Sequence, residues 1–458
     1  MPLLILAVGA LAVLLQGAFF RGSDGNPLAC AAAAAGGVAA LLPGSGEPPI
    51  LGLAATPFSR YFTILFCLCA LLTLLLSRGH NRRSGIGGEE FAATVLFAAL
   101  GMSVTCMAQN LLILFLGLES LTFAFYILTA ADRGSEASGE AGLKYLILGA
   151  AAAAFNAFGI ALLYAGSGTL ALPSALQVGV HGEGRTILLA GLGFLLAGLA
   201  FKVSLVPFHL WTPDVYEGAP PPVTGFLSTA SKGAVFASLL ILFSGWDIET
   251  LKPPLRCLAL ASMVLGNLAP LLQGNLRRML AYSSVAQMGY ITLALLTGTP
   301  EGYEAVAFYA AAYAAMNIAA FGVISSLSGG RPLQSVRQLR GVGYRHPLRG
   351  GLLALSMLAL AGIPPTIGFT GKFAIFLAAL KGGETGLAVA GLLTAAVSVY
   401  YYLRVVVNLY MHPAEGTSDA PACGIGEAAA LAAAAAAIVV PGIFPSPMFE
   451  LLRRVISG

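Results

Sequence analysis

The run LLILFLGLESLTFAFYIL at residues 111–128 indicates which kind of fold this chain adopts. Glu119 is its only charged residue, and a helix of that length spans about 27 Å, close to the hydrocarbon thickness of a bilayer. Similar apolar runs recur along the whole chain, without the alternation of polar and apolar residues that is typical of a membrane β-barrel. The sequence therefore predicts an all-α polytopic membrane protein.

The composition of the chain agrees with this class. Of the 458 residues, 58% are hydrophobic and only 10% are charged, whereas a soluble domain carries about 25% charged residues. The net charge of +4 is small, and we interpret it as a membrane topology bias rather than as a sign of nucleic-acid binding. The six cysteines lie mostly in apolar runs, and the spacing of Cys67 and Cys69 fits no metal-binding pattern. We therefore expect small apolar core residues and no metal, haem or iron–sulfur cluster.

Charged residues, glycines and prolines divide the chain into about fourteen expected transmembrane helices. They cover residues 2–20, 27–43, 56–77, 91–108, 109–130, 141–166, 187–211, 219–244, 255–273, 277–297, 304–328, 350–380, 386–410 and 424–444. The first has no basic residues ahead of it and no small-residue cleavage site, so it predicts a retained helix rather than a signal peptide. Since no long polar linker separates the helices, residues 1–458 are expected to form a single integral membrane domain.

The basic residues of the loops predict the orientation. Counted with the helix ends beside them, the loops after odd-numbered helices hold twelve lysines and arginines, and the loops after even-numbered helices, with the C-terminal tail, hold seven. Because short basic loops stay on the cytoplasmic side of a membrane, the odd loops are expected in the cytoplasm and both termini in the periplasm.

A few charged residues lie well inside the expected helices: Glu119, Lys144, Lys202, Lys232, Lys372 and Arg404. All of them except Arg404 are candidate functional residues. A charge at the bilayer centre costs at least about 2.5–3.5 kcal/mol, so it needs a partner, water or a function. We expect Arg404, near a helix end, to extend its side chain to the membrane interface. Lys144, one turn after Glu140, fits either a structural ion pair or a functional role.

Two of these lysines lie in helices that the sequence interrupts. Lys202 belongs to LAFKVSLVPFHLW (199–211), where Pro207 is expected to break or kink the helix. His209 follows seven residues after Lys202 and would share its face on an unbroken helix. Lys372 belongs to LAGIPPTIGFTGKFAIF (360–376), which a Pro-Pro pair and two glycines interrupt. Interrupted helices at membrane depth are typical of repeated transporter halves.

The chemistry of such sites favours a proton relay. A buried lysine holds its proton more firmly beside a carboxylate, so moving or neutralising that carboxylate releases the proton. Lys232, in FLSTASKGAVF (226–236), stands beside small hydroxylated residues that can hold water. We expect hydroxyls such as those of Ser204, Ser231 and Tyr126 to bridge gaps between the charged groups.

Three segments carry a resemblance to a known family. VPFHLWTPDVYEGAPPPVTGFLSTASKGAVF (206–236), NLRRMLAYSSVAQMGY (275–290) and LAGIPPTIGFTGKF (360–373) resemble the antiporter-like membrane subunits of proton-translocating NADH:quinone oxidoreductase, respiratory complex I. The family also includes subunits of multisubunit sodium/proton antiporters. The resemblance covers roughly residues 90–410.

Within the family, the chain looks most like the N-type subunits, called subunit 2 in mitochondria. WTPDVYEGAP (211–220) is the form of that segment found in this type, and GFTGKF places a lysine at 372 where the M-type carries a glutamate. The chain also ends soon after the fourteenth expected helix, without the lateral helix of the L-type.

The resemblance implies a fold of two inverted five-helix repeats, each with one broken helix. The repeats would cover residues 89–244 and 255–411, between three N-terminal helices (1–88) and a C-terminal segment with helix 14 (412–458). This arrangement agrees with the positions of the interrupting prolines.

The resemblance also implies a role for each charged residue. Glu119 pairs with Lys202, Lys232 is the central relay site, and Lys372 is the terminal exchange site toward the periplasm. Lys144 and His209 match further positions of the N-type.

The implied function is that of a non-redox, proton-translocating subunit in a bacterial inner membrane. NADH, FMN, iron–sulfur clusters and quinone are then expected on other subunits, with no cofactor in this chain. The expected partners are other complex I membrane subunits, including homologous antiporter-like ones, and the lipid bilayer, but no nucleic acid. A cation/proton antiporter of the Mrp type, without a redox partner, would use the same charges. A scaffold whose charges only hold helices together is the third interpretation.

Overall fold

The computed structural model describes residues 1–20, 24–42, 52–172, 185–244, 248–328, 333–413 and 420–457. These residues form helices and turns, with only isolated bridges between single residues in place of strands. Eleven of the described helices are long and apolar enough to cross a membrane. The prediction of an all-α polytopic membrane protein is confirmed.

The first half of the chain, through its eighth expected span, comprises α1 (Pro2–Phe19), α2 (Asn26–Leu41), α3 (Pro57–Ser84), α4 (Gly88–Met107), α5 (Leu111–Thr129), α6 (Glu136–Ser167), α8 (Arg185–Val203), α9 (Trp211–Gly218), α10 (Pro221–Phe226), the π-helical turn η1 (Leu227–Ser231) and α11 (Lys232–Ser244). The second half comprises η2 (Ile248–Thr250), α12 (Lys252–Leu268), η3 (Ala269–Leu272), α13 (Leu276–Leu295), α14 (Pro300–Leu327), η4 (Val336–Leu339), α15 (Val342–Arg345), α16 (Pro347–Ala361), α17 (Ile367–Lys381), α18 (Thr385–Tyr410), α19 (Ile425–Ile443) and α20 (Ser446–Ser457).

Three of the expected spans have no single long apolar helix, each for a different reason. The second span, α2, has only 16 residues, although it is apolar. The tenth, α13, carries Arg277 and Arg278 in its first turn and is buried among other helices along most of its length. The twelfth is divided into α16 and α17, of 15 residues each. The break predicted from the Pro-Pro pair in the twelfth span is therefore present.

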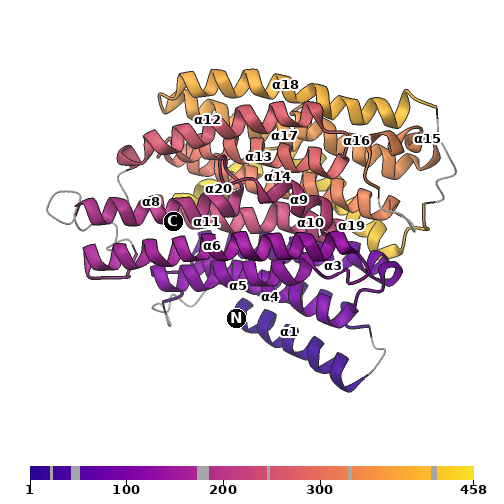
Figure 1. Cartoon of the computed structure of the whole chain (residues 1–458), viewed down its shortest axis with the longest axis horizontal. Coiled ribbons are helices and arrows are strands. Elements are labelled where there is room, and N and C mark those ends of the chain that lie inside the picture. Colours follow the sequence, from indigo (N-terminus) through magenta and orange to yellow (C-terminus); the bar gives the residue numbers. More distant parts are fainter. Residues whose placement is uncertain are drawn as a thin grey trace.

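The long helices lie side by side and run in nearly the same direction across the view, with α1 at one edge and α18 at the opposite edge (Figure 1). Within the first half, α4 packs on α5 and α6 packs on α8. Within the second half, α12 packs on α13 and α14 packs on α16 and α17. Because α14 also contacts α10 and η1, it joins the two halves near the middle of the bundle.

The last helix, α20, was not predicted as a separate element. It is a short amphipathic helix that turns its apolar side, with Leu452 and Val455, toward the bundle, where it packs on α14 and α3. The ring of Phe449 stacks on Phe308 of α14, with 4.5 Å between the ring centroids. Apolar residues at helical spacing over 448–455 are the sequence signal that would have identified it.

The end of α19 packs directly on the break of the twelfth span, and this contact depends on a glycine. A Cβ added at Gly442 would lie 2.5 Å from the carbonyl oxygen of Pro365 and 2.6 Å from the backbone nitrogen of Ile367. The Thr370 hydroxyl donates to the carbonyl oxygen of Gly442 at 3.5 Å. The backbone of α19 therefore helps to position the broken helix that carries Lys372.

We expect Gly442→Ala to destabilise the protein by about 1–3 kcal/mol, because the added methyl group overpacks a contact made by backbone atoms. The thermal unfolding midpoint of the detergent-purified protein measures this effect. Gly386→Ala in α18 is the matched control, since a Cβ there meets nothing within 4 Å. Equal midpoints for the two variants would contradict the expectation.

Candidate functional site

Glu119 and Lys202 form a buried ion pair between α5 and α8. The Lys202 Nζ atom lies 3.0 Å from Glu119 Oε1, and the two side chains are 4% and 24% exposed, respectively. The ammonium group also donates to the hydroxyl of Thr122, at 2.6 Å. Thr122 lies one turn after Glu119, so one face of α5 supplies both partners of the lysine.

The chain leaves the helical conformation directly after Lys202. Helix α8 ends at Val203, and α9 starts only at Trp211, so the break predicted around Pro207 is present. The Trp211 indole donates to the carbonyl oxygen of Phe201 at 2.9 Å, and the Thr212 hydroxyl donates to Ser204 Oγ at 2.7 Å. Polar side chains thus satisfy groups that the break frees from the helix.

His209 lies inside this break and is half-buried. Because α8 ends at Val203, the helix face that His209 would share with Lys202 does not exist. Its ring instead lies 6.3 Å from the ring of Tyr282 of α13, measured between centroids.

Lys232 is the first residue of α11 and directly follows the π-helical turn η1. Such turns are frequent at functional sites. The side chain is 1% exposed, and its ammonium group donates to Ser284 Oγ of α13 at 2.6 Å. The Nζ atom lies 5.6 Å from the centroid of the Tyr216 ring, and the Tyr216 hydroxyl is 3.2 Å from the same serine oxygen.

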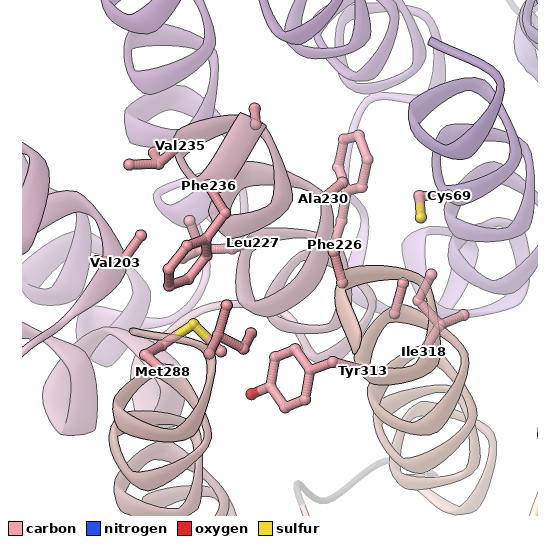
Figure 2. Packing of buried hydrophobic residues seen from close by; sticks show 14 of the residues in the cluster. Cys69, Val203, Phe226, Leu227, Ala230, Val235, Phe236, Met288, Tyr313 and Ile318 are labelled. Atoms are coloured by element: carbon pink, nitrogen blue, oxygen red, sulfur yellow. The ribbon is translucent and has the colours of Figure 1, made fainter. Parts of the chain in front are cut away.

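Apolar side chains of neighbouring helices surround the segment that carries Lys232. Figure 2 shows the segment from Phe226 to Phe236 packed among side chains of four other helices. They include Cys69 of α3, Val203 of α8, Met288 of α13, and Tyr313 and Ile318 of α14. Within the described part of the chain, no ion pair joins Lys232 to a carboxylate.

Lys372 lies in α17, just after the break of the twelfth span, and is 5% exposed. Its ammonium group donates to the carbonyl oxygens of Leu360 and Ala361, at 2.7 and 3.2 Å. These are the last two residues of α16, where the helix dipole presents partial negative charge. The Tyr290 ring lies 5.4 Å from Nζ, so neutral groups hold this lysine.

Lys144 is placed apart from the three buried lysines. Its side chain is 44% exposed and pairs with Glu140 at 2.7 Å and with Asp214 of α9 at 2.9 Å. Asp214 in turn pairs with Arg278 of α13 at 2.7 Å, and Arg278 pairs with Glu217 at 2.8 Å. Lys144 therefore belongs to a network at the surface that joins α6, α9 and α13.

The guanidinium group of Arg404 lies against the end of a neighbouring helix, and its position at the membrane interface stays a prediction. Its guanidinium group donates to the carbonyl oxygens of Pro270, Leu271 and Gln273, at 3.3, 3.2 and 2.6 Å. The last carbonyl groups of a helix have no hydrogen-bond donors within the helix. Arg404 of α18 provides donors for these carbonyl groups at the end of η3.

The hydroxyls that contact the lysines differ from those expected. The Ser204 hydroxyl accepts from Thr212, Ser231 donates to the carbonyl oxygen of Leu227 in its own helix, and the buried hydroxyl of Tyr126 has no hydrogen-bond partner. Thr122 and Ser284 contact the lysines instead. Thr122 could have been found from its spacing to Glu119, but Ser284 lies on a different helix from its lysine.

Three buried ammonium groups beside two helix breaks and a π-helical turn, in a bundle of membrane-spanning helices, are features typical of ion-translocating membrane proteins. A family described as "NADH:quinone oxidoreductase/Mrp antiporter, TM" matches residues 108–398. The chain belongs to this family.

Relatives of high sequence identity indicate the same family. The chain is 56% identical to NADH-quinone oxidoreductase subunit N of Geobacter metallireducens, over 99% of this chain and 98% of that one. It is 44% identical to subunit N of Syntrophotalea carbinolica, over 98% and 97% of the two chains.

Solved structures share the fold. A chain of respiratory complex I from Thermus thermophilus superimposes with a TM-score of 0.86 at 38% identity, covering 98% of this chain and 99% of that one. A chain of the Mrp complex from Dietzia superimposes with a TM-score of 0.82 at 20% identity, covering 100% and 96%. The latter match concerns the fold alone. Together with the helix breaks, these matches establish the polytopic fold of antiporter-like subunits.

Proposed function

We propose that this chain is a proton-translocating membrane-arm subunit of NADH-quinone oxidoreductase and that its buried acid and lysines carry the protons. Quinone reduction elsewhere in the complex would drive the transfer. One observation carries the proposal: three buried lysines lie at the interruptions of membrane helices, and only Lys202 has a carboxylate partner among the described residues. Charges that served only to hold helices together would be expected to come in pairs.

The proposed sequence of events starts at the ion pair. While Glu119 stays close, the ammonium group of Lys202 is stabilised. When a change in the complex moves or neutralises Glu119, Lys202 loses its counter-charge and passes its proton toward Lys232. Lys372, held by carbonyl dipoles, then exchanges the proton with the periplasm.

Lys144 and His209 are proposed as further proton carriers of the relay, outside the series of Lys202, Lys232 and Lys372. Lys144 lies in an exposed network of acids, where it can exchange protons with water. His209 lies in the break after Lys202, where water can reach backbone groups freed from the helix.

The chain itself would carry no redox cofactor. NADH, FMN, iron–sulfur clusters and quinone would be bound by other subunits, and homologous antiporter-like subunits would be neighbours in the membrane. We place the chain in a bacterial inner membrane with both termini in the periplasm, because the loops after odd-numbered spans hold most of the loop lysines and arginines. An Mrp-type antiporter is the second candidate, and relatives named subunit N favour the first.

The test uses the assembled complex in inverted membrane vesicles. Lys202→Ala and Lys372→Ala are each expected to reduce NADH-driven proton uptake about tenfold or more, which corresponds to about 1.4 kcal/mol or more in the limiting step. Lys381→Ala, at the exposed end of α17, should pump like the parent. If both buried-lysine variants pumped like the parent, the relay would be refuted. Uptake driven by a sodium gradient without NADH would favour the antiporter.

A further inference from the structure

The Lys372 site contains a buried glutamine, Gln287, that is not one of the proton carriers of the proposed relay. Gln287 of α13 is 1% exposed, and its side chain is fully hydrogen-bonded. Its Nε2 group donates to Tyr402 Oη at 3.1 Å and to the carbonyl oxygen of Leu360 at 3.3 Å, and its Oε1 atom accepts from the Tyr309 hydroxyl at 2.6 Å. Both amide hydrogens and the amide oxygen are in use.

Gln287 and Lys372 meet at one backbone oxygen. The carbonyl of Leu360 accepts from the ammonium group of Lys372 at 2.7 Å and from the Gln287 amide at 3.3 Å. This carbonyl belongs to the last turn of α16, directly before the helix break. The glutamine therefore helps to orient the acceptor that holds the lysine.

A comparable side chain in the first half of the chain carries a charge. In each proposed repeat, the second helix directs a side chain of similar length toward the broken helix: Glu119 from α5 and Gln287 from α13. Glutamine and glutamate have nearly the same shape, but only glutamate is an anion. Lys202 thus has a carboxylate as its partner. Lys372 instead has a neutral amide beside it, and both groups donate to the carbonyl oxygen of Leu360.

The titratable groups that face Lys372 add no negative charge to its site. Tyrosines face the cluster from three of the helices packed against α17: Tyr290 of α13, Tyr309 of α14, and Tyr401 and Tyr402 of α18. The titratable residues of α16 and α19, Arg349 and Glu427, lie at the distant first turns of these helices. No ion pair joins Lys372 to an acid among the described residues.

We propose that Gln287 is a positioning residue that keeps the Lys372 site free of negative charge, and that this neutrality makes Lys372 the end of the relay that releases the proton. The inference rests on the proposed function, since it assumes that Lys372 carries a proton. A carboxylate at residue 287 would hold the lysine in its charged form, as Glu119 holds Lys202.

The experiment compares two substitutions in the assembled complex in inverted vesicles. Gln287→Glu is expected to reduce NADH-driven proton uptake about tenfold at neutral pH and to move the pH profile of uptake upward by about one to two pH units, the shift that one opposite charge at 4–6 Å produces. Uptake should return as the pH is raised. Gln287→Met removes the hydrogen bonds without adding charge, so it is expected to slow uptake and leave the pH profile in place.

Asn26→Asp is the matched control. Asn26 of α2 is also a buried amide and donates to the carbonyl oxygen of Leu74, but α2 packs on α1, α3 and α4 and not on the helices around Lys372. Its pH profile should stay within about half a unit of the parent. The inference is overturned if Gln287→Glu keeps the parent profile, or if Gln287→Met or Asn26→Asp shifts it as much. Normal pumping by Lys372→Ala would instead refute the relay itself, which separates the two failures.

Discussion

Replacing Lys232 by methionine is expected to abolish NADH-driven proton uptake without lowering the stability of the protein. The side chain is 1% exposed, and its ammonium group donates a hydrogen bond to Ser284 Oγ. A methionine fills a similar volume and removes a charge that is costly to bury, so the free energy of unfolding should stay the same or rise. The relay, however, loses its central proton carrier, and uptake should fall by about tenfold or more.

The combination of lost proton uptake with unchanged stability distinguishes a relay from a scaffold. If the lysine only held helices together, Lys232→Met would lower the thermal unfolding midpoint and leave uptake in place. Lys252→Met is a suitable control, since Lys252 is also buried, at 9% exposure, but pairs with Glu249 at 2.5 Å. The control is expected to pump like the parent. Normal uptake by Lys232→Met would remove that residue from the mechanism.

The second large effect is expected at the ion pair, where stability and pumping should respond differently. Glu119→Gln leaves the ammonium group of Lys202, 4% exposed, without its carboxylate. Removing one partner of a buried pair costs about 3–5 kcal/mol, and we expect about 2–4 kcal/mol here because the Glu119 side chain is 24% exposed, so water can partly replace it beside the ammonium group. Lys202→Met should cost less, since it leaves the partly exposed carboxylate within reach of water.

The double variant Glu119→Gln/Lys202→Met completes the cycle. It is expected to recover most of the stability lost in Glu119→Gln, because no buried charge remains unpaired, while proton uptake stays lost in all three variants. Thermal unfolding midpoints of the detergent-purified protein and vesicle uptake are the two measurements. Strictly additive changes in stability would mean that the two side chains do not interact, and the proposed switch would have no basis.

Part of the site could be predicted from the sequence because its causes are local. A proline removes a backbone donor wherever it stands, so the breaks around Pro207 and before Lys372 were predictable without a partner helix. The cost of a charge in hydrocarbon likewise selected the buried lysines from the composition of single segments. The same criterion selected Lys144 and Arg404, which the structure places in a surface network and at a helix end.

The contacts of the lysines depend on distant parts of the chain. Lys232 meets Ser284 across 52 positions of sequence, and Gln287 meets the carbonyl of Leu360 across 73. No spacing rule connects such residues, because the rotation and depth of each helix are decided by how its side chains pack against its neighbours.

Alone, then, the sequence determined the membrane class, the approximate spans, the two breaks and the residues that are costly to bury, since each follows from the chemistry of one short segment. The tertiary structure decided which lysine has a carboxylate and which are held by neutral groups. That difference arises only when α5 meets α8 and α13 meets the end of α16, because partners from separate helices are brought together by packing.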